Sequence, residues 1–285
     1  MTLSIIIVSW NVQEKLINNL TALLSSEVNF DYEVFVVDNN SGDGTVAAIS
    51  SQFPNVKIIA NKENLGFAKA NNQAIKVATG KHILLLNPDM RVQKDTLSKM
   101  VTWFELHPQA MVASCKLVSE VGAVIPHVRR FPTITDQLAI VLKIPHLFPG
   151  ILNKYLVKDF NYNLNGKVDS VRGSFFLMRR KKNGLPVLDE RYFIWFEEVD
   201  YCLQVRRAGF EVWYTPEATC VDYIGASFNQ VKRNATQIYF QNSMLEYFKK
   251  WHPRWQYFIL KTTWPLGRAL ASLGQLIKFK NNKVT

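Results

Sequence analysis

The fold is decided by the stretch Glu33–Thr45, which reads EVFVVDNNSGDGT. Its first part is a short apolar run rich in valine, which is typical of a strand buried on both faces. The run ends at Asp38, and the asparagines, serine and glycines that follow are turn-forming residues. Asp43 or Thr45 can then begin a short helix that ends before Phe53. The stretch therefore predicts a strand, a turn and a helix in that order.

The same alternation extends to both sides of this stretch. Further short apolar runs rich in Ile, Val and Leu are Leu3–Val8, Val56–Ala60 and His82–Asn87. Helix-forming composition with apolar periodicity occurs between them at Gln13–Ser25 and Phe67–Ala78, and Gly80 is placed to close the second helix. This alternation predicts an α/β fold with a mainly parallel sheet, flanked by helices and joined by right-handed crossovers.

Ligands of parallel sheets bind outside the carboxyl ends of the strands. The polar residues at these ends are therefore the first candidates for function: Ser9, Asn11, Asp38, Asn39, Asn40, Asn61, Asn87 and Asp89. Asp38 can accept a hydrogen bond from the ring N–H of a nucleotide base, or it can cap its own turn. Asp89 follows Pro88 at a strand tip, where it offers an oxygen ligand to a hard divalent cation or belongs to a plain turn.

The composition is that of a globular protein, with 48% hydrophobic and 12% aromatic residues among 285. It excludes disorder, collagen-like repeats and low-complexity architecture, and the length fits one large α/β domain or a domain with an appendage. Cys115, Cys202 and Cys220 are widely spaced, which fits neither a disulfide framework nor a zinc site and indicates a reducing cytosol. The first apolar run is shorter than a signal-peptide core of ~7–15 residues, so we expect a strand there.

The net charge of +11 is concentrated in one segment. From Tyr247 to Thr285 the chain has no acidic residue, and its basic residues there are Lys249, Lys250, Arg254, Lys261, Arg268, Lys278, Lys280 and Lys283. Residues 1–246 are close to neutral, with no continuous basic stripe and no nucleic-acid-binding motif. We therefore expect no nucleic-acid partner.

In the same basic segment Leu266, Leu270, Leu273 and Ile277 recur at helical spacing. A basic amphipathic helix of this kind is typical of attachment to an anionic membrane surface. Charged residues and a proline interrupt it, so it cannot span a membrane as ~20 apolar residues would. The alternative is a helix packed on its own domain with a solvated basic face.

Two common nucleotide-binding motifs are absent from the sequence. The turn after the first apolar run reads SWNV (9–12) instead of the glycine-rich turn of a dinucleotide-binding fold, and there is no Gly-x-x-x-x-Gly-Lys-Ser/Thr segment. Nor is this turn the glycine-rich loop with Arg or Lys that a nucleotidyltransferase has after its first strand, which disfavours that class of enzyme. What remains is a set of carboxylates and amides at one edge of a sheet.

Several segments, in this order, resemble one family. They are VDNNSGDGT (37–45), NLGFA (64–68) with Asn71-Asn72, LLNPD (85–89), VRGSFFLMRR (171–180) and FEEVDYCL (196–203). Across roughly residues 3–250 they are similar to the family 2 glycosyltransferases of GT-A fold, with the bacterial rhamnosyltransferase-like branch as the nearest likeness. The resemblance implies a GT-A domain over 1–250, with a nucleotide-binding half (1–110) and an acceptor and catalytic half (111–250). A basic C-terminal extension, 251–285, follows.

The resemblance assigns roles to the strand-end acids. In this family the position of Asp38 reads the pyrimidine base of a nucleoside diphosphate sugar. Asp89 belongs to the Asp-x-Asp element that holds a divalent cation on the diphosphate, and Asn87 replaces the first acid of that element here. Asp222 stands where the family commonly has a histidine that completes the metal site. Asp222 remains an acceptable ligand for Mn²⁺ or Mg²⁺ and can offset the charge missing at Asn87.

Glu197, Glu198 and Asp200 are the candidates for the catalytic base. The preceding aromatic stretch Tyr192–Phe196 can raise a carboxylate pKa by desolvation. A helix from here to Ala208 would place Glu197 and Asp200 on one face and Glu198 away from Asp200. By resemblance the family's base aligns with Glu198, where Asp is usual. The alternative is an acidic helix N-terminus stabilised by the helix dipole.

Further candidates surround these groups. For the diphosphate or ribose they are Asn64, Gly66, Lys69 and Asn72, and for the acceptor they are Arg172, Gly173 and Ser174. Amides beside a glycine also form ordinary caps, and a glycine in a strand also marks a bulge. The segment 126–167, rich in proline and poor in periodicity, is either a mobile acceptor loop or an irregular insertion.

The combined expectation is an inverting, metal-dependent glycosyltransferase. A carboxylate would take the acceptor proton and a cation would neutralise the leaving diphosphate. The enzyme would move a hexosyl unit, rhamnosyl by resemblance, from a UDP- or dTDP-sugar to a glycan or lipid-linked glycan. This step of cell-surface polysaccharide synthesis would occur in the cytoplasm, at the inner face of a bacterial membrane. The departures at Asn87, Glu198 and Asp222 leave one alternative, a nucleotide-sugar-binding partner of another transferase.

Overall fold

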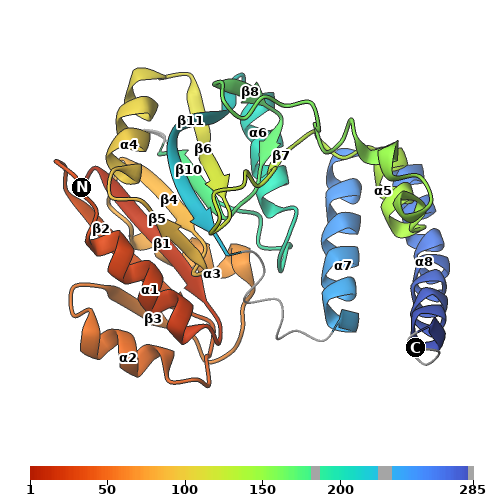
Figure 1. Cartoon of the computed structure of the whole chain (residues 1–285), viewed down its shortest axis with the longest axis horizontal. Helices are drawn as coiled ribbons and strands as arrows, with labels where there is room; N and C mark the ends of the chain where they lie inside the picture. The colour runs from red at the N-terminus through yellow and green to blue at the C-terminus, as the bar shows by residue number, and fades with distance from the viewer. Residues whose placement is uncertain (181–186, 224–232, 282–285) are drawn as a thin grey trace.

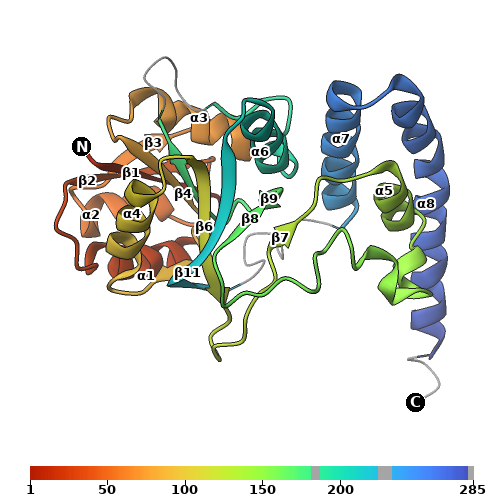
Figure 2. The ribbon, with the colours of Figure 1, turned by 90° about the horizontal axis from the view of Figure 1, so that it is seen from above.

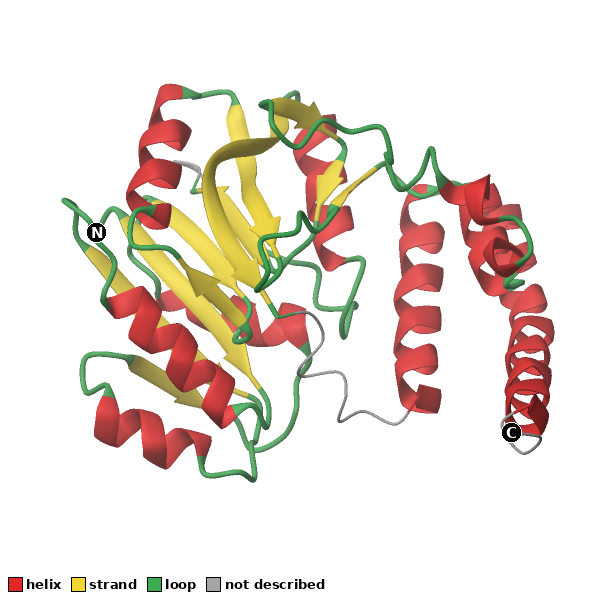
Figure 3. Cartoon of the chain, in the orientation of Figure 1, coloured by secondary structure: helices red, strands yellow, loops and turns green. Residues whose placement is uncertain are grey.

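The computed structural model describes residues 1–180, 187–223 and 233–281, and for 233–234 and 271–281 the backbone alone. A central sheet carries helices on both faces (Figures 1 and 3). Its strands are β1 Leu3–Ser9, β2 Tyr32–Asp38, β3 Lys57–Ala60, β4 His82–Leu86, β5 Met90–Val92, β6 Ala110–Val118, β8 Gly166–Val168, β10 Phe175–Arg179 and β11 Glu211–Asp222. Their order is β3-β2-β1-β4-β10-β6-β11-β5, with β8 paired to β11. The predicted α/β class is confirmed.

The remaining elements connect and cover this sheet. The helices are α1 Gln13–Leu24, α2 Thr45–Gln52, α3 Phe67–Val77, α4 Thr96–Leu106, α5 Ile134–Val141, α6 Glu197–Arg207, α7 Arg233–Trp251 and α8 Arg254–Asn281, with 3-10 turns η1 Ile144–His146 and η2 Pro149–Leu152. A small second sheet pairs β7 Val128–Arg129 with β9 Ser170–Val171. The Gly-x-Ser at 225–227, which located Asp222 in the sequence, lies outside the described residues.

The first half of the chain folds as its periodicity predicts. Strands β1, β2, β3 and β4 pair in parallel, and α1, α2 and α3 begin at the predicted residues. The prediction that Gly80 closes α3 is wrong, because α3 ends at Ala78 in extended backbone (φ −64°, ψ 144°). Gly80 instead lies against β1, where a Cβ atom would come 2.5 Å from the backbone nitrogen of Ser4.

The register of the pairing gathers polar residues at one edge. In the β1–β2 pair Ser9 lies beside Asp38. Antiparallel β10 enters between β4 and β6, and the backbone nitrogen of Asn87 donates to the Ser174 carbonyl over 2.9 Å. In the β5–β11 pair Asp222 lies beside Met90, the residue after Asp89. Residues far apart in the chain thus share one edge of the sheet.

Helices α5, α7 and α8 stand together beside the sheet (Figures 1 and 2). One buried hydrophobic cluster joins them to the segment before α6: Val141, Tyr192, Phe196, Met244, Tyr247, Phe248, Leu260 and Trp264. The boundary predicted between residues 250 and 251 therefore falls inside the last turn of α7, in a helix that shares a core with α8. The first half of α8 packs on its own domain, which is the alternative that the sequence left open beside membrane attachment.

The predicted apolar stripe of α8 is not the face that packs. Leu260 and Trp264 are buried, whereas Leu266 and Leu270 are 55% and 38% exposed. Gly267 lies so close to α5 that a Cβ atom would come 2.4 Å from the Val141 carbonyl oxygen. None of the helices within the described residues has the length and apolar character that crossing a membrane requires.

Gly80→Ala should destabilise the fold, because the added methyl group would meet the backbone of Ser4 and force β1 and β4 apart. We expect the free energy of unfolding, measured by urea denaturation, to fall by about 1–3 kcal/mol. Gly42→Ala is the matched control, since nothing lies within 4 Å of a Cβ atom there. Equal unfolding midpoints for the two variants would contradict the assigned contact.

Candidate active site

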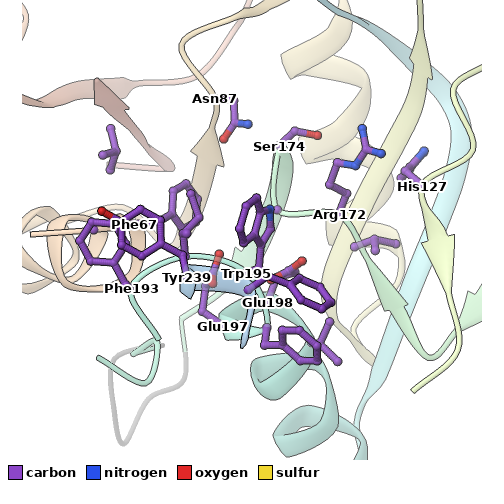
Figure 4. A pocket seen from close by; sticks show the side chains of 18 of the residues that line it. Phe67, Asn87, His127, Arg172, Ser174, Phe193, Trp195, Glu197, Glu198 and Tyr239 are labelled. Carbon is purple, nitrogen blue, oxygen red and sulfur yellow. The ribbon is translucent and has the colours of Figure 1, made fainter. Parts of the chain in front are cut away.

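A cavity of about 710 Å³ opens at this edge of the sheet. Among the residues predicted for the site, those that line it are Ser9, Asn64, Gly66, Asn87, Asp89, Arg172, Gly173, Ser174, Glu197, Glu198 and Asp222. Figure 4 shows Glu197 and Glu198 between the rings of Phe193 and Tyr239 on one side and Arg172 and His127 on the other. The structure thus brings the nucleotide, metal, base and acceptor candidates to a single cleft.

The other predicted residues lie outside the lining of this cavity: Asn11, Asp38, Asn40, Lys69, Asn72 and Asp200. Lys69 and Asn40 are exposed to solvent. Asn11, at a positive φ of 51°, accepts a hydrogen bond from the backbone nitrogen of Gly42 over 2.7 Å. This bond holds the turn after β2 against the turn after β1, so Asn11 shapes the edge of the site.

Asp38 is buried beside the lining residues Ser9 and Asn39, and only one of its carboxylate oxygens has a partner among the described residues. One carboxylate oxygen accepts a hydrogen bond from the backbone nitrogen of Ser41 over 2.8 Å, as a turn cap does. Its other oxygen is buried and has no hydrogen-bond partner among the described residues, and the same holds for the hydroxyl of Ser9 beside it. Buried polar atoms are costly when unpaired, so these two atoms indicate a place where a ligand donates.

Asn39, one of the strand-end candidates, lines the cavity and joins its parts. Its side chain donates to the Gly66 carbonyl over 3.2 Å and accepts from Asn61 over 3.0 Å. Gly66 has a positive φ of 80°, and a Cβ atom there would come 2.4 Å from the Phe193 carbonyl oxygen. That carbonyl accepts a hydrogen bond from the backbone nitrogen of Phe67 over 2.7 Å. The start of α3 is thereby docked on the loop that leads into α6.

Asn72 holds the segment upstream of the same loop. Its buried side chain donates to the Leu188 carbonyl over 2.8 Å and accepts from the Leu188 backbone nitrogen over 3.0 Å. Asn72 also donates to Glu190 over 3.0 Å. These bonds consume the amide, so Asn72 positions backbone instead of reaching a nucleotide.

Asp200 is fully buried and is occupied by the protein itself. Its carboxylate accepts from Lys250 over 2.7 Å, from Gln204 over 2.6 Å and from Tyr192 over 3.2 Å, and it also accepts from the indole of Trp251. These donors occupy both carboxylate oxygens, and Asp200 does not line the cavity. Asp200 therefore anchors α7 to α6, and only two of the three acidic candidates face the cleft.

Glu197 and Glu198 begin α6 and enter the cavity together. The helix runs to Arg207 and is closed by Gly209, while Trp195 and Phe196 before it have positive φ values of 65° and 67°. Left-handed backbone costs energy in bulky residues and persists where the surroundings enforce it. Here it turns the chain so that both carboxylates point into the cleft.

The electrostatics of the pair differ between its members. Burial, reinforced by the neighbouring Glu198 charge, raises the pKa of Glu197 well above its ordinary value. Burial also raises the pKa of Glu198, against the opposing effect of its own backbone hydrogen bond and of the Arg172 charge. Glu197 is 4% exposed and Glu198 is half-buried, and one oxygen of each lacks a partner among the described residues. Such groups can hold or release a proton near neutral pH.

Asp89 and Asp222 supply the carboxylates for a cation. Both are nearly buried in the cavity wall, with Asn87 beside them, and Asp222 also lies 3.4 Å from an Arg172 nitrogen. Among the described residues no three His, Cys, Asp or Glu side chains gather as a complete metal site. Mg²⁺ and Mn²⁺ are typically held by one or two carboxylates together with phosphate oxygens of a substrate. The donor set therefore fits a cation shared with a bound diphosphate.

Several lining residues carried no signal that the sequence reasoning could use. Near Arg172 they include His127 and Arg129, Tyr155 also lines the cavity, and the aromatic wall consists of Phe193, Trp195, Tyr239 and Phe240. Phe193 and Tyr239 stack with ring centres 4.5 Å apart. In the sequence, the aromatic stretch before α6 indicates only that the pKa of a nearby carboxylate can be raised. His127 and Arg129 lie in the irregular segment 126–167, where no spacing marks them.

Comparison with known sequences finds glycosyltransferases that are similar to this chain over most of its length. Rhamnosyltransferase WbbL of Escherichia coli is 26% identical over 234 residues, covering 77% of this chain and 82% of WbbL. The N-acetylglucosaminyl-diphospho-decaprenol L-rhamnosyltransferase of Mycobacterium tuberculosis is 24% identical over 209 residues, covering 69% of this chain and 68% of that protein. A 36% identical match over 103 residues covers only 26% of the uncharacterized glycosyltransferase YfnE of Bacillus subtilis.

Solved structures share the fold at low sequence identity. The mannosyltransferase PcManGT of Pyrobaculum calidifontis, in complex with GDP-Man and Mn²⁺, superposes with a TM-score of 0.58 at 18% identity, covering 96% of this chain and 75% of that one. GalNAc-T7, with UDP, GalNAc and Mn²⁺, gives a TM-score of 0.60 at 13% identity over 86% of this chain and 48% of its own. The model of glycosyl transferase family 2 matches residues 4–184. With the fold, the cleft and this match in agreement, the chain belongs to glycosyl transferase family 2.

Proposed function

We propose that this protein is an inverting hexosyltransferase that uses a UDP- or dTDP-sugar to extend a glycan or lipid-linked glycan of a bacterial cell surface. The observation that carries the proposal is the position of Glu197 and Glu198, which face the cavity that Asp89 and Asp222 also line. An acceptor hydroxyl needs a base, and a departing diphosphate needs charge neutralisation. The cleft offers groups for both.

Glu198 is the proposed base. It takes the proton of the acceptor hydroxyl as the hydroxyl oxygen bonds to the anomeric carbon, and the bond from that carbon to the diphosphate breaks. Attack opposite the leaving group inverts the anomeric centre. Glu198 is preferred to Glu197 because it is less buried and the Arg172 charge stabilises its ionised form. Gly173 leaves room beside it, since a Cβ atom there would already touch the Glu198 side chain at 3.6 Å.

The donor nucleotide is assigned to the Asp38 end of the cleft. The unpartnered Asp38 oxygen can accept the ring N–H that uracil and thymine share, and Ser9 and Asn64 are placed for the ribose and diphosphate. Asp89 and Asp222, with the Asn87 amide, would hold Mg²⁺ or Mn²⁺. When bound, that cation would neutralise charge on the leaving diphosphate. An acid at position 222 makes up for the neutral residue at 87.

The rhamnosyl unit and the lipid-linked acceptor are proposed from two relatives whose names include rhamnosyltransferase, one of them acting on a diphospho-decaprenol. Attachment to the inner membrane face is proposed from α8. Its outer surface exposes Trp255 by 54% and Phe258 by 57%, and its C-terminal turns are rich in lysine. Apolar side chains beside basic ones suit an anionic lipid surface.

Glu198→Gln should lower sugar transfer by about 10²–10⁴-fold while leaving donor affinity unchanged, because the amide cannot accept the proton. The measurement is release of UDP or dTDP from UDP- and dTDP-sugars with Mn²⁺ and a panel of glycan acceptors. In the parent enzyme kcat/KM should fall as the pH falls through the raised pKa of Glu198, which lies above its ordinary 4.5, since the ionised form is the active one.

The matched control for this substitution is Glu120→Gln, which changes an exposed glutamate in the same way. A Glu198→Gln enzyme with the parent rate would refute the assignment of the base. Tight donor binding without transfer to any acceptor of a broad panel would instead favour a nucleotide-sugar-binding partner of another transferase.

Asp222→Ala should weaken Mn²⁺-dependent binding of the nucleoside diphosphate about tenfold, because one of two carboxylates for the cation is lost. Isothermal titration with UDP and dTDP, in Mn²⁺ and in EDTA, measures the effect. Asp159→Ala, at an exposed aspartate, is the control. Unchanged affinity in Mn²⁺ would show that Asp222 does not help to hold the cation.

Replacing Lys278, Lys280 and Lys283 by Gln should reduce binding to anionic vesicles at low salt about a hundredfold, at roughly 1 kcal/mol per lysine near the surface. Sedimentation with vesicles measures this, and the substitution spares the packed first half of α8. The control replaces the exposed Lys62, Lys94 and Lys99, which removes the same charge elsewhere. Equal loss in both variants would mean that α8 is not the attachment site.

A further inference from the structure

Helix α1 carries a polar side chain in the middle of its buried face. The buried residues of this helix are Leu16, Asn19, Leu20 and Leu23, and Asn19 is only 2% exposed. Their spacing is that of an apolar stripe packed on a sheet, where packing favours an apolar residue at every position. The amide oxygen of Asn19 is buried and has no hydrogen-bond partner among the described residues, which is destabilising. Packing alone therefore does not account for an asparagine at this position.

The amide nitrogen of Asn19 has a distant partner. It donates a hydrogen bond to the backbone carbonyl of Asn87 over 2.9 Å, across 68 positions of the chain. Asn87 directly follows β4 and begins the segment 87–89, which we call the β4 tip. Asn87 and Asp89 line the active-site cavity, and both are among the groups proposed to hold the cation. The bond thus joins the buried face of α1 to the proposed cation site.

Two further elements hold the backbone of the β4 tip. The Asn87 nitrogen donates to the Ser174 carbonyl over 2.9 Å, and the Tyr223 nitrogen donates to the Asp89 carbonyl over 3.1 Å. The ring of the proline between Asn87 and Asp89 fixes its own φ and restricts the residue before it. The carbonyl that Asn19 binds belongs to the peptide group that enters this proline. Because a peptide group is planar, holding its carbonyl also fixes the direction of the chain on both sides.

The start of α1 is tied to the other end of the cleft. The backbone nitrogen of Gln13 donates to the Asp43 carboxylate over 3.0 Å, and that of Asn11 donates to the Ser41 hydroxyl over 2.9 Å. Ser41 and Asp43 belong to the turn after β2. From Gln13 to Asn19 the helix rises about 9 Å, at 1.5 Å per residue. One helix therefore sets the spacing between the turn after β2 and the β4 tip.

We propose that Asn19 is a positioning residue for the bound diphosphate and its cation. By holding the Asn87 carbonyl, it keeps the side chains of the β4 tip at a fixed place relative to the nucleotide end of the cleft. The inference rests on the proposed transferase function and adds to it a residue that does not line the cavity. Because Asn19 acts through Asn87, its loss should weaken the cation-dependent contacts with the diphosphate and spare those with the base and ribose.

The experiment is titration calorimetry of the full chain with UDP and with dTDP, each in Mn²⁺ and in EDTA. Asn19→Leu removes the donor and keeps a similar volume. The gain from Mn²⁺, which is the ratio of the dissociation constants in EDTA and in Mn²⁺, should fall about tenfold, since removing a group that orients a cation ligand has an effect of this size. The affinity in EDTA should be unchanged. Asn19→Ala, which introduces no new group, should give the same result.

The matched control is Asn18→Leu, which makes the same change one residue earlier, on the exposed side of α1, and should keep the parent gain from Mn²⁺. Asn19→Leu should unfold in urea near the parent midpoint, because it removes an unpaired buried oxygen together with the hydrogen bond. An equal loss of affinity in Mn²⁺ and in EDTA would overturn the inference, since it indicates a general structural role for Asn19.

Failure of this inference and failure of the proposed function give different results. A gain from Mn²⁺ in the parent that survives both substitutions at Asn19 refutes only the positioning role. A parent protein that binds UDP and dTDP equally well in Mn²⁺ and in EDTA has no cation shared with the diphosphate, which refutes the proposed cation site and the role of Asn19 with it. A parent that binds neither nucleotide refutes the proposed function.

Discussion

The site depends on one contact between two halves of the chain, the docking of the α3 N-terminus on the backbone before α6. The Phe67 nitrogen donates to the Phe193 carbonyl over 2.7 Å, and Gly66 lies beneath it where any side chain would collide. Asn39, directly after β2, donates a hydrogen bond to the Gly66 carbonyl and so joins the start of α3 to the end of β2. Without this contact the end of the cleft near Asp38 and the end with the glutamates would be separate surfaces. With it they become opposite walls of one cleft.

Much of this architecture was predictable, and what was not has a physical reason. The first four strands and three helices follow from local periodicity, and the paired glutamates from a contiguous motif. The antiparallel β10 between β4 and β6 was missed, because pairing between segments some ninety residues apart leaves no local pattern. The sequence shows residue types but not the groups that each residue contacts. Asn72 and Asp200 are therefore predicted to contact a ligand, whereas in the fold Asn72 binds the backbone of Leu188 and Asp200 binds Lys250 of α7.

The proposed cation site has a carboxylate at a different position from the family pattern. The strand tip after β4 has Asn87 where the family pattern has an acid, while Asp222 ends β11, which pairs with β5, the strand that follows Asp89. Arg172 lies against Asp222 and also lowers the cost of ionising Glu198. One arginine therefore lies near both a proposed cation ligand and the proposed base. Two buried carboxylates without a full set of hydrogen-bond partners destabilise the fold, and such destabilising groups are characteristic of functional sites.

Asp200 lies three positions after Glu197 and is held by Lys250 and Trp251, the last residues of α7. Lys250 also forms an ion pair with Asp189, which follows Leu188, the residue whose carbonyl accepts a hydrogen bond from Asn72. The end of α7 therefore contacts both the helix that carries the glutamates and the loop that leads to that helix. If the C-terminal helices attach to a bilayer as proposed, a tilt of these helices would act through the end of α7 on the first turn of α6, and the positions of Glu197 and Glu198 would then depend on how the enzyme lies on the membrane.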